Sequence, residues 1–254
     1  MTPKVALVTG GAQGLGAAVC HALSRRGWSV AVADINAEGA QAVATACAAG
    51  AFPIEVDLGT AHGPQAMIEA CVNRTQRLDA LVNCAAASPA EAFLEMTAEA
   101  WTLALSVNVR AVALSMAAAA REMIKGGGGR IVNVTSAAAR MALPNYAAYA
   151  ATKAAVDSLT RSAAVALAGD AIRVNSVSPG MMDTPLQMRT EEIFCRLESR
   201  SDIERFRAER TARIPLGRRT TPEEMADTIV WLVVDAPEYM TAERLNVSGG
   251  LDKD

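Results

Sequence analysis

Near its N-terminus the chain reads Val5-Ala6-Leu7-Val8-Thr9-Gly10-Gly11-Ala12-Gln13-Gly14-Leu15-Gly16. The apolar, β-branched run Lys4–Thr9 predicts a buried strand, and a helical pattern over Ala17–Arg26 follows the glycines. Glycines between a strand and a helix permit a tight turn, and they let a pyrophosphate approach backbone N–H groups at the positive end of the helix. A glycine-rich turn is often only a turn, so the residues that follow must support this interpretation.

The second strand supplies that support. Trp28–Asp34 predicts a strand that ends in a carboxylate. A carboxylate there can accept hydrogen bonds from the adenosine ribose of a dinucleotide, and it would repel a 2′-phosphate. We therefore expect NAD rather than NADP as the cofactor. The alternative is that Asp34 is only a solvated strand end or a helix cap.

Strand and helix patterns alternate along the rest of the chain. Further strands are expected at Ala51–Val56, Leu78–Asn83, Arg130–Thr135, Ala171–Val177 and Glu243–Val247, and further helices at Ala37–Ala49, Gln65–Arg74, Ala98–Lys125, Tyr146–Ala168 and Thr221–Val234. This alternation predicts a parallel sheet with helices on both faces. No linker or repeat interrupts the 254 residues. We predict one α/β domain over residues 1–254, built on a doubly wound sheet of about seven strands.

Tyr149 and Lys153 form a candidate proton-transfer pair. They are four residues apart in a helical pattern, which places both side chains on one face. A phenol has a pKa of about 10 and is a poor base at neutral pH. An ammonium one turn away favours the phenolate, so we expect Lys153 to lower the pKa of Tyr149. Such a pair is more often a simple surface contact, which makes the surrounding residues important.

Composition excludes several other classes of function. The net charge of −3 argues against a nucleic-acid partner. We expect no apolar run to approach the roughly 20 residues that span a bilayer, and the N-terminus lacks a signal-peptide pattern. The five cysteines have no metal-type spacing and the two histidines fall in a helix and a turn, so no metal site is expected. Reduced thiols predict a cytoplasmic protein.

These motifs, taken in order, resemble the short-chain dehydrogenase/reductase family, and the resemblance extends from Val5 to Gly250. It implies a Rossmann-like fold and an NAD-dependent oxidoreductase. The cofactor landmarks that it implies are Gly10, Gln13, Gly14, Leu15 and Gly16 in the turn; Asp34 and Ile35; Asp57 and Leu58 beside adenine; Asn83 and Ala85; Tyr149 and Lys153; and Pro179, Gly180, Met182 and Thr184 beside the nicotinamide.

The resemblance also assigns catalytic roles. Tyr149 would exchange the proton of the alcohol, and Lys153 would support the phenolate and bind the nicotinamide ribose. Ser136 would donate a hydrogen bond to the substrate oxygen. Asn108, in the middle of the expected helix Ala98–Lys125, would hold a water that links Lys153 to solvent. Independently of the resemblance, a buried amide at this position needs a polar partner.

Two positions depart from the family pattern. Ser248 stands where the family has an acid before the terminal Gly-Gly, and we expect this change to be tolerated because it does not touch the reacting groups. Ala86 stands where the family has a glycine, which could strain a loop that needs glycine's backbone freedom. Because this residue does not touch the reacting groups, we expect the change to be tolerated.

The segment 181–219 has no strand pattern and predicts a helical insertion at the carboxyl end of the sixth strand, where ligands bind in parallel sheets. We expect it to be a lid over the substrate. Seven of its arginines, between Arg189 and Arg213, could bind an anionic substrate, or they could pair with six of its acidic residues on solvated faces. The near balance favours pairing, and hence a neutral polyol or simple secondary alcohol as the substrate.

Two alternative functions remain open. An NADPH-dependent 3-oxoacyl carrier-protein reductase would share the catalytic residues, although Asp34 and the neutral Gln13 argue against it. A nucleotide-binding regulator without catalysis is the other, and the presence of both Tyr149 and Lys153 argues against that. Family resemblance and the Ala-rich helix faces further imply a homotetramer.

Overall fold

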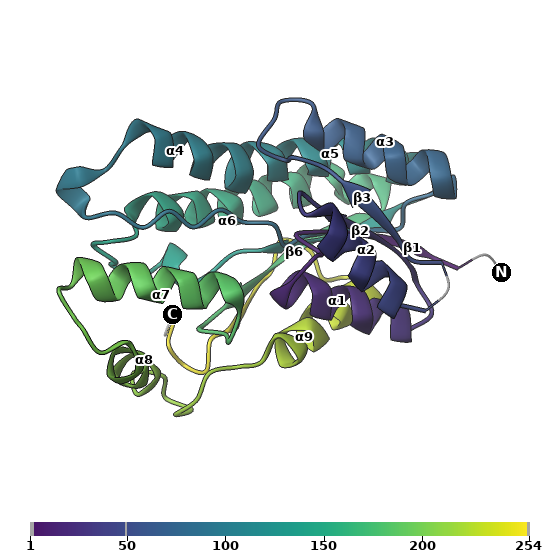
Figure 1. The fold of residues 1–254 in the computed structure, drawn as a ribbon. Coiled ribbons are helices and arrows are strands. Elements are labelled where there is room, and N and C mark those ends of the chain that lie inside the picture. The colour runs from purple at the N-terminus through teal and green to yellow at the C-terminus, as the bar shows by residue number, and fades with distance from the viewer. Residues whose placement is uncertain (1–2, 49, 253–254) are drawn as a thin grey trace.

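The computed structural model describes residues 3–48 and 50–252. Its centre is a parallel sheet of seven strands in the order β3-β2-β1-β4-β5-β6-β7, with each neighbouring pair parallel (Figure 1). The strands are β1 Val5–Thr9, β2 Ser29–Asp34, β3 Phe52–Glu55, β4 Ala80–Asn83, β5 Gly129–Val134, β6 Ile172–Pro179 and β7 Arg244–Val247. The predicted doubly wound, Rossmann-like sheet in a single domain is confirmed.

Helices cover both faces of this sheet. The helices are α1 Gly14–Arg25, α2 Ala37–Ala46, α3 Gly63–Thr75, α4 Ala98–Leu105, α5 Ala111–Lys125, α6 Ala147–Leu167, α7 Pro185–Leu197, α8 Ile203–Thr211 and α9 Pro222–Val234. In Figure 1, α1 and α9 lie on one side of the sheet, and α3, α5 and α6 lie on the other.

The alternation of side chains along β1 explains why both faces are covered. Ala6 and Val8 pack in one buried cluster with residues of α1, α2 and α9. Val5 and Leu7 pack in a second cluster with residues of α3, α5 and α6. Successive residues of a strand point to opposite faces, so a strand that is apolar throughout must be buried on both.

Some helices begin or end at other residues than the sequence predicts, because contacts with residues far away in the sequence determine where they stop. Helix α1 begins at Gly14 rather than Ala17, so the glycine turn runs directly into the helix. Helix α2 ends at Ala46, before the predicted end, and residue 49 lies outside the described residues. The backbone N–H of Ala48 donates to Ser24 Oγ at 2.7 Å, a contact that draws the chain away from helical geometry.

The helix expected over Ala98–Lys125 forms, but its middle is a π-helical turn, Ser106–Arg110. This 28-residue helix is long and apolar enough to cross a membrane by length and composition, so the expectation that no such run exists was wrong. Half of its most apolar window is buried inside the protein. Ala111, Met116, Ala119 and Met123 are buried, and Met116, Ala119 and Met123 belong to the same cluster as Val5 and Leu7 of β1. Its apolar character is that of a core helix.

The segment 181–219 forms α7 and α8, as the absence of a strand pattern predicted. Thr184 caps α7 by accepting a hydrogen bond from the Gln187 N–H at 3.2 Å. A single parallel bridge joins Met182 to Thr220, so the two ends of the segment lie side by side. Helix α9 follows with the predicted Thr221 cap and Pro222 in its first turn.

Candidate active site

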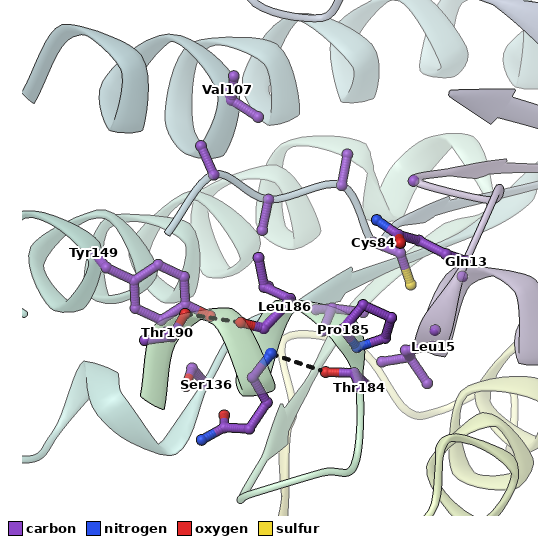
Figure 2. A pocket seen from close by; sticks show the side chains of 18 of the residues that line it. Gln13, Leu15, Cys84, Val107, Ser136, Tyr149, Thr184, Pro185, Leu186 and Thr190 are labelled. Atoms are coloured by element: carbon purple, nitrogen blue, oxygen red, sulfur yellow. Dashed lines mark hydrogen bonds between the residues drawn. The ribbon is translucent and has the colours of Figure 1, made fainter. Parts of the chain in front are cut away.

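A pocket of about 410 Å³ opens at the carboxyl ends of the strands. Figure 2 shows Tyr149 and Ser136 on one side of it and Gln13 and Leu15 on the other. The structure brings the following predicted site residues to its lining: Gly10, Gln13, Gly14, Leu15, Gly16, Asp34, Ile35, Asp57, Leu58, Ala85, Ser136, Tyr149, Lys153, Pro179, Gly180, Met182 and Thr184. Asn83 and Asn108 are the predicted site residues that do not line it.

The glycine turn has the close backbone packing that a dinucleotide cradle needs. Gly10 has a φ of +67°, and a Cβ there would lie 2.8 Å from the Cα of Ala85. A Cβ at Gly16 would lie 2.0 Å from the carbonyl oxygen of Gly10. A larger residue at Gly10 would displace the turn from the loop after β4, and one at Gly16 would clash within the turn itself. The residues present therefore fit a pyrophosphate held against the N-terminus of α1.

Thr9 holds the other side of this cradle, a role that the sequence did not indicate. Its hydroxyl accepts hydrogen bonds from the N–H groups of Cys84 and Ala85, at 3.0 and 3.1 Å. Thr9 is almost fully buried, so these two backbone donors have no water available and need this acceptor. Ala86 in the same loop does not have a positive φ, so its substitution for glycine causes no backbone strain.

The two carboxylates of the pocket lie at the ends of β2 and β3. Asp34 Oδ2 accepts a hydrogen bond from Ala12 N and Oδ1 accepts one from Asn36 N, both at 3.0 Å. Asp34 is not the cap of α2, because Asn36 caps that helix by accepting from Gly39 N. Asp57 Oδ1 accepts from Gly59 N at 2.7 Å. Both carboxylates are fixed by backbone donors while they face the pocket.

Asn83 does not take the position predicted for it. Its side chain is buried at the end of β4 and donates a hydrogen bond to Asn133 Oδ1 at 2.8 Å. Asn133 in turn donates to Thr160 Oγ1 at 2.9 Å. The Asn83 side chain thus joins the ends of β4 and β5 to α6. Its side chain supports the pocket from beneath instead of lining it.

Tyr149 and Lys153 share one face of α6, as their spacing predicts. The Lys153 ammonium lies 5.6 Å from the centre of the Tyr149 ring and donates to the Val134 carbonyl oxygen at 2.8 Å. Ser136 follows β5, where its Oγ accepts a hydrogen bond from Ala138 N at 3.1 Å. All three side chains line the same half of the pocket.

The expected depression of the Tyr149 pKa is wrong for this structure. Burial raises the pKa of Tyr149 well above its usual range, the neighbouring Tyr146 raises it further, and a hydrogen bond with Ser136 offsets part of the increase. Desolvation penalises the charged phenolate, and the sequence pattern Tyr-x-x-x-Lys does not reveal how deeply the phenol is buried. In this state the tyrosine holds its proton and is a proton donor.

Lys153 is shifted in the opposite direction. Burial lowers the pKa of Lys153 to about 8, while Cys84 and Asp157 act to raise it. The ammonium is therefore close to losing its proton near neutral pH, which suits a group that takes part in proton transfer. Burial also raises the pKa of the Cys84 thiol to about 12, so this pocket residue stays protonated.

Asn108 lies within the π-helical turn and is fully buried. Its Nδ2 donates to the Ala87 carbonyl at 2.8 Å and to Thr152 Oγ1 at 3.0 Å, and its Oδ1 accepts from Ala87 N at 2.8 Å. The buried Asn108 amide was expected to need a hydrogen-bond partner, and both of its N–H donors have one. Both Nδ2 hydrogens are used, so any relay water at this residue must bind to an oxygen.

Three hydroxyl groups near Tyr149 were missed by sequence reasoning. The Tyr146 ring stacks on the Tyr149 ring with centres 4.3 Å apart and an angle of 15°. The Tyr146 hydroxyl hydrogen-bonds with Ser88 and Thr190, whose own oxygens lie 3.0 Å apart. Tyr146 and Thr190 line the pocket. The elements that carry these residues are far apart in sequence, so only the fold brings them together.

The ion pairs of the arginine-rich segment 181–219 also differ from the prediction. Glu191 was expected on a solvated helix face, but it is fully buried. Arg219 binds both of its oxygens, at 2.9 and 3.0 Å, and Arg210 Nε lies 3.1 Å away. Burial would raise the pKa of Glu191, but hydrogen bonds from Arg219 and Gln187 hold it below its usual value. Arginines that follow α7 thus close around a carboxylate of α7.

Comparison with known proteins agrees with this geometry. A family model described as enoyl-(acyl carrier protein) reductase, a short-chain dehydrogenase group, matches residues 10–252. The chain is 38% identical to a cis-4-hydroxycyclohexanecarboxylate dehydrogenase of Sinomonas cyclohexanicum, over 97% of this chain and 96% of the relative. It is 36% identical to a sorbitol dehydrogenase of Cereibacter sphaeroides, again over 97% and 96% of the two chains.

Solved structures show the same fold. An actinorhodin polyketide ketoreductase variant with NADPH has a TM-score of 0.94 and 29% identity, over 99% of this chain and 98% of that one. A 3-ketoacyl-(acyl-carrier-protein) reductase from Brucella melitensis complexed with NADH has a TM-score of 0.89 and 28% identity, over 98% of each chain. With Ser136, Tyr149 and Lys153 in one pocket behind a glycine turn, this chain belongs to the short-chain dehydrogenase/reductase family and is an oxidoreductase that acts on alcohols or ketones.

Proposed function

We propose that the protein oxidises a secondary alcohol of a small hydroxylated molecule and uses NAD as the electron acceptor. The observation that carries the proposal is the arrangement of one pocket. A glycine cradle and Asp34 lie in one half, and Ser136, Tyr149 and Lys153 lie in the other. A dinucleotide placed with its pyrophosphate at the N-terminus of α1 would extend from the first half to the second.

Asp34 supports NAD over NADP. Its carboxylate faces the pocket and would accept hydrogen bonds from ribose hydroxyls, whereas a 2′-phosphate would meet it as a like charge. Among the described residues that line the pocket, Lys153 and Arg189 are the cationic side chains. Neither belongs to the Asp34 half, so a phosphate there would have no charge partner from the lining.

NAD, when bound, supplies the acceptor for the hydride that leaves the carbinol carbon, so the alcohol becomes a ketone, NAD becomes NADH and one proton is released. Tyr149 is placed to take the hydroxyl proton as a phenolate, and to return a proton when a ketone is reduced. Its raised pKa favours the protonated form, so oxidation depends on the nearby Lys153 ammonium to stabilise the phenolate. Ser136 would donate to the substrate oxygen and stabilise the charge that develops on it.

The relatives support a polyol or a similar small substrate, because they include a sorbitol dehydrogenase and, at 34% identity, a D-threitol dehydrogenase of Mycolicibacterium smegmatis. A second candidate is NADPH-dependent reduction of a 3-oxoacyl carrier protein. A reductase of that name from Synechocystis is 34% identical over 99% of this chain.

Steady-state turnover separates the two candidates. We would measure NADH formation with a panel of polyols and secondary alcohols, and in parallel NADPH and NADH consumption with a 3-oxoacyl carrier protein. The proposal predicts NADH formation with at least one alcohol and little activity with the acyl carrier protein. Efficient reduction of the acyl substrate with NADPH alone would contradict it.

A further inference from the structure

Arg189 is a cation at the pocket whose charge is not paired with any of the described residues. It is exposed on α7 and lines the pocket. Its side chain makes no ion pair or hydrogen bond with any residue in the ranges 3–48 and 50–252. An arginine in a ligand pocket with its five N–H donors free is a site for an oxygen anion.

Most of the other arginines in residues 181–219 pair with carboxylates, unlike Arg189. Arg207, Arg210 and Arg219 surround the buried Glu191, with ion-pair distances of 3.6, 3.1 and 2.9 Å. Arg200 and Arg205 both pair with Glu209, at 2.7 and 2.9 Å. Arg196 and Arg213 are exposed, but neither lines the pocket. The numbers of arginines and acidic residues in the segment are nearly equal, but Arg189 is not one of the arginines that pair with them.

Helix α7 places Arg189 in the half of the pocket that holds the tyrosines. At its beginning, the Thr184 side chain lies 3.6 Å from where a Cβ of Gly14 would stand, beside the glycine cradle. Farther along, Thr190 Oγ1 lies 3.0 Å from Ser88 Oγ, and the Phe194 ring meets the Tyr146 ring edge-on at 5.1 Å. Arg189 precedes Thr190 and lies about 7.5 Å along the helix from Thr184.

The surroundings of Arg189 favour an anion attached to an apolar body. The acidic residues of the pocket, Asp34 and Asp57, follow β2 and β3 on the adenosine side. Elsewhere the pocket lining includes the apolar side chains Ala86, Ala87, Leu103, Val107 and Leu186. A guanidinium binds a carboxylate through two parallel hydrogen bonds, and such charge-assisted bonds are roughly twice as strong as neutral ones.

We infer that Arg189 binds a carboxylate of the substrate, and that the substrate is a hydroxy acid with a compact apolar body between its hydroxyl and its carboxylate. This inference rests on the proposed function, because it names the class of alcohol. It differs from the neutral substrate that the charge balance of the sequence favoured. The structure distinguishes one unpaired pocket arginine from those that pair with Glu191 and Glu209.

Ligand binding tests the inference without turnover. Cyclohexanecarboxylate and cyclohexanecarboxamide have nearly the same shape but differ in charge, and neither can be oxidised at a carbinol. Calorimetric titration of each into the enzyme–NADH complex gives their dissociation constants. We expect the carboxylate to bind about 10- to 100-fold more tightly than the amide. Arg189→Met should remove that preference and Arg189→Lys should keep part of it.

Arg196→Met is the matched control, because Arg196 is an exposed arginine of the same helix that does not line the pocket and has no ion-pair partner among residues 3–48 and 50–252. It should keep the preference for the carboxylate. Failure of the carboxylate to bind, equal binding of the two ligands, or a preference that survives Arg189→Met would each overturn the inference.

Kinetics with 4-hydroxycyclohexanecarboxylate and its carboxamide separate this inference from the proposed function. Arg189→Met should raise KM for the acid at least 10-fold more than KM for the amide. A rise in KM for NAD in place of that difference would assign Arg189 to the cofactor phosphates and overturn the inference. A carboxylate preference in binding, without oxidation of any alcohol, would refute the proposed function alone.

Discussion

Lys153 and Tyr149 show how burial sets the chemistry of single residues. Both are nearly inaccessible to solvent, and burial favours the uncharged form of each, the neutral amine and the protonated phenol. The spacing of the pair in the sequence predicts their shared helix face, but not the size or sign of these effects. Holding either residue in its charged form within this site therefore costs folding free energy.

The Tyr149 hydroxyl is expected to be essential for turnover and dispensable for cofactor binding. Tyr149→Phe should lower kcat by at least about 100-fold, because it removes the proton-transfer group. NAD affinity, measured by calorimetry, should change little. Tyr146→Phe is the matched comparison, since it removes a hydroxyl from the stacked neighbour, and its loss of kcat should be far smaller. A near-normal kcat for Tyr149→Phe would contradict the mechanism.

Lys153→Met should abolish activity, weaken NAD binding and stabilise the fold at neutral pH. The folded pKa of about 8 lies below the value of about 10.5 expected in the unfolded chain. The folded state therefore carries a penalty of about 3 kcal/mol below pH 8, and this penalty disappears as the pH rises toward 10.5. Loss of the hydrogen bond to Val134 offsets part of the gain, leaving about 1–3 kcal/mol.

Urea unfolding of wild type and Lys153→Met at pH 7 and at pH 10 checks this prediction. The difference in the free energy of unfolding should be largest at pH 7 and smaller at pH 10. A difference that does not depend on pH would mean that folding does not lower the pKa of the Lys153 amine.

Asp34 is expected to set cofactor choice. We predict that kcat/KM for NAD exceeds that for NADP by about 100-fold, or about 2.7 kcal/mol. Asp34→Ala should narrow the ratio, because it removes the like charge beside a 2′-phosphate. Steady-state kinetics with both cofactors gives the ratio directly, and equal use of NADP by the wild type would disprove the role assigned to Asp34.

At the scale of elements, α7 and α8 behave as one unit attached to the rest of the chain by few contacts. Glu191 joins α7 to Arg207 and Arg210 of α8 and to Arg219 beyond it. The contacts of α7 with the tyrosine side of the pocket include the Thr190–Ser88 hydroxyl pair and the edge-on packing of Phe194 on Tyr146. Such a unit can open without breaking its internal ion pairs.

We therefore predict that residues 181–219 form a lid that becomes ordered on ligand binding. Hydrogen exchange should show greater protection across α7 and α8 when NAD and substrate are both present. Helix α9 serves as the internal reference, because its buried residues pack in the core below β1, and its protection should change little. Equal protection of 181–219 with and without ligands would show a fixed wall.

How far the sequence predicts these elements depends on how local their causes are. The Thr221 cap and Pro222 predict the start of α9, since capping uses only neighbouring residues. The glycine turn and the shared helix face of Tyr149 and Lys153 could be predicted for the same reason, because each depends only on residues that are close in the sequence. Glu191 could not be recognised as buried, because its sequence looks like any charged helix face, and its three arginines come from later segments. Asn83 pairs across the sheet with Asn133, a contact set by strand order.

At the scale of the whole molecule, the exposed apolar side chains of α5 and α6 point to assembly. Val165 on α6 is 78% exposed, and Leu114 and Ile124 on α5 are also exposed. Exposed apolar groups gathered on neighbouring helices often mark protein–protein contacts. They support the homotetramer that family resemblance implies.

Light scattering coupled to size-exclusion chromatography tests this assembly. We expect a mass four times that of the 26.5-kDa chain. Val165→Glu should shift the mass toward smaller species if α6 lies in a subunit contact, whereas Arg196→Glu on the exposed face of α7 should not. A wild-type mass of a single chain would contradict the prediction.

The cluster around Glu191 also bears on how such an enzyme diverges. A buried carboxylate normally ties distant parts of a fold together, so that changes in one part require changes in another. Here the carboxylate and the arginines that neutralise it all belong to residues 181–219. Lineages could therefore exchange or remodel this segment as an inherited block, acquiring a different substrate while the sheet, the glycine turn and Tyr149 stay as they were.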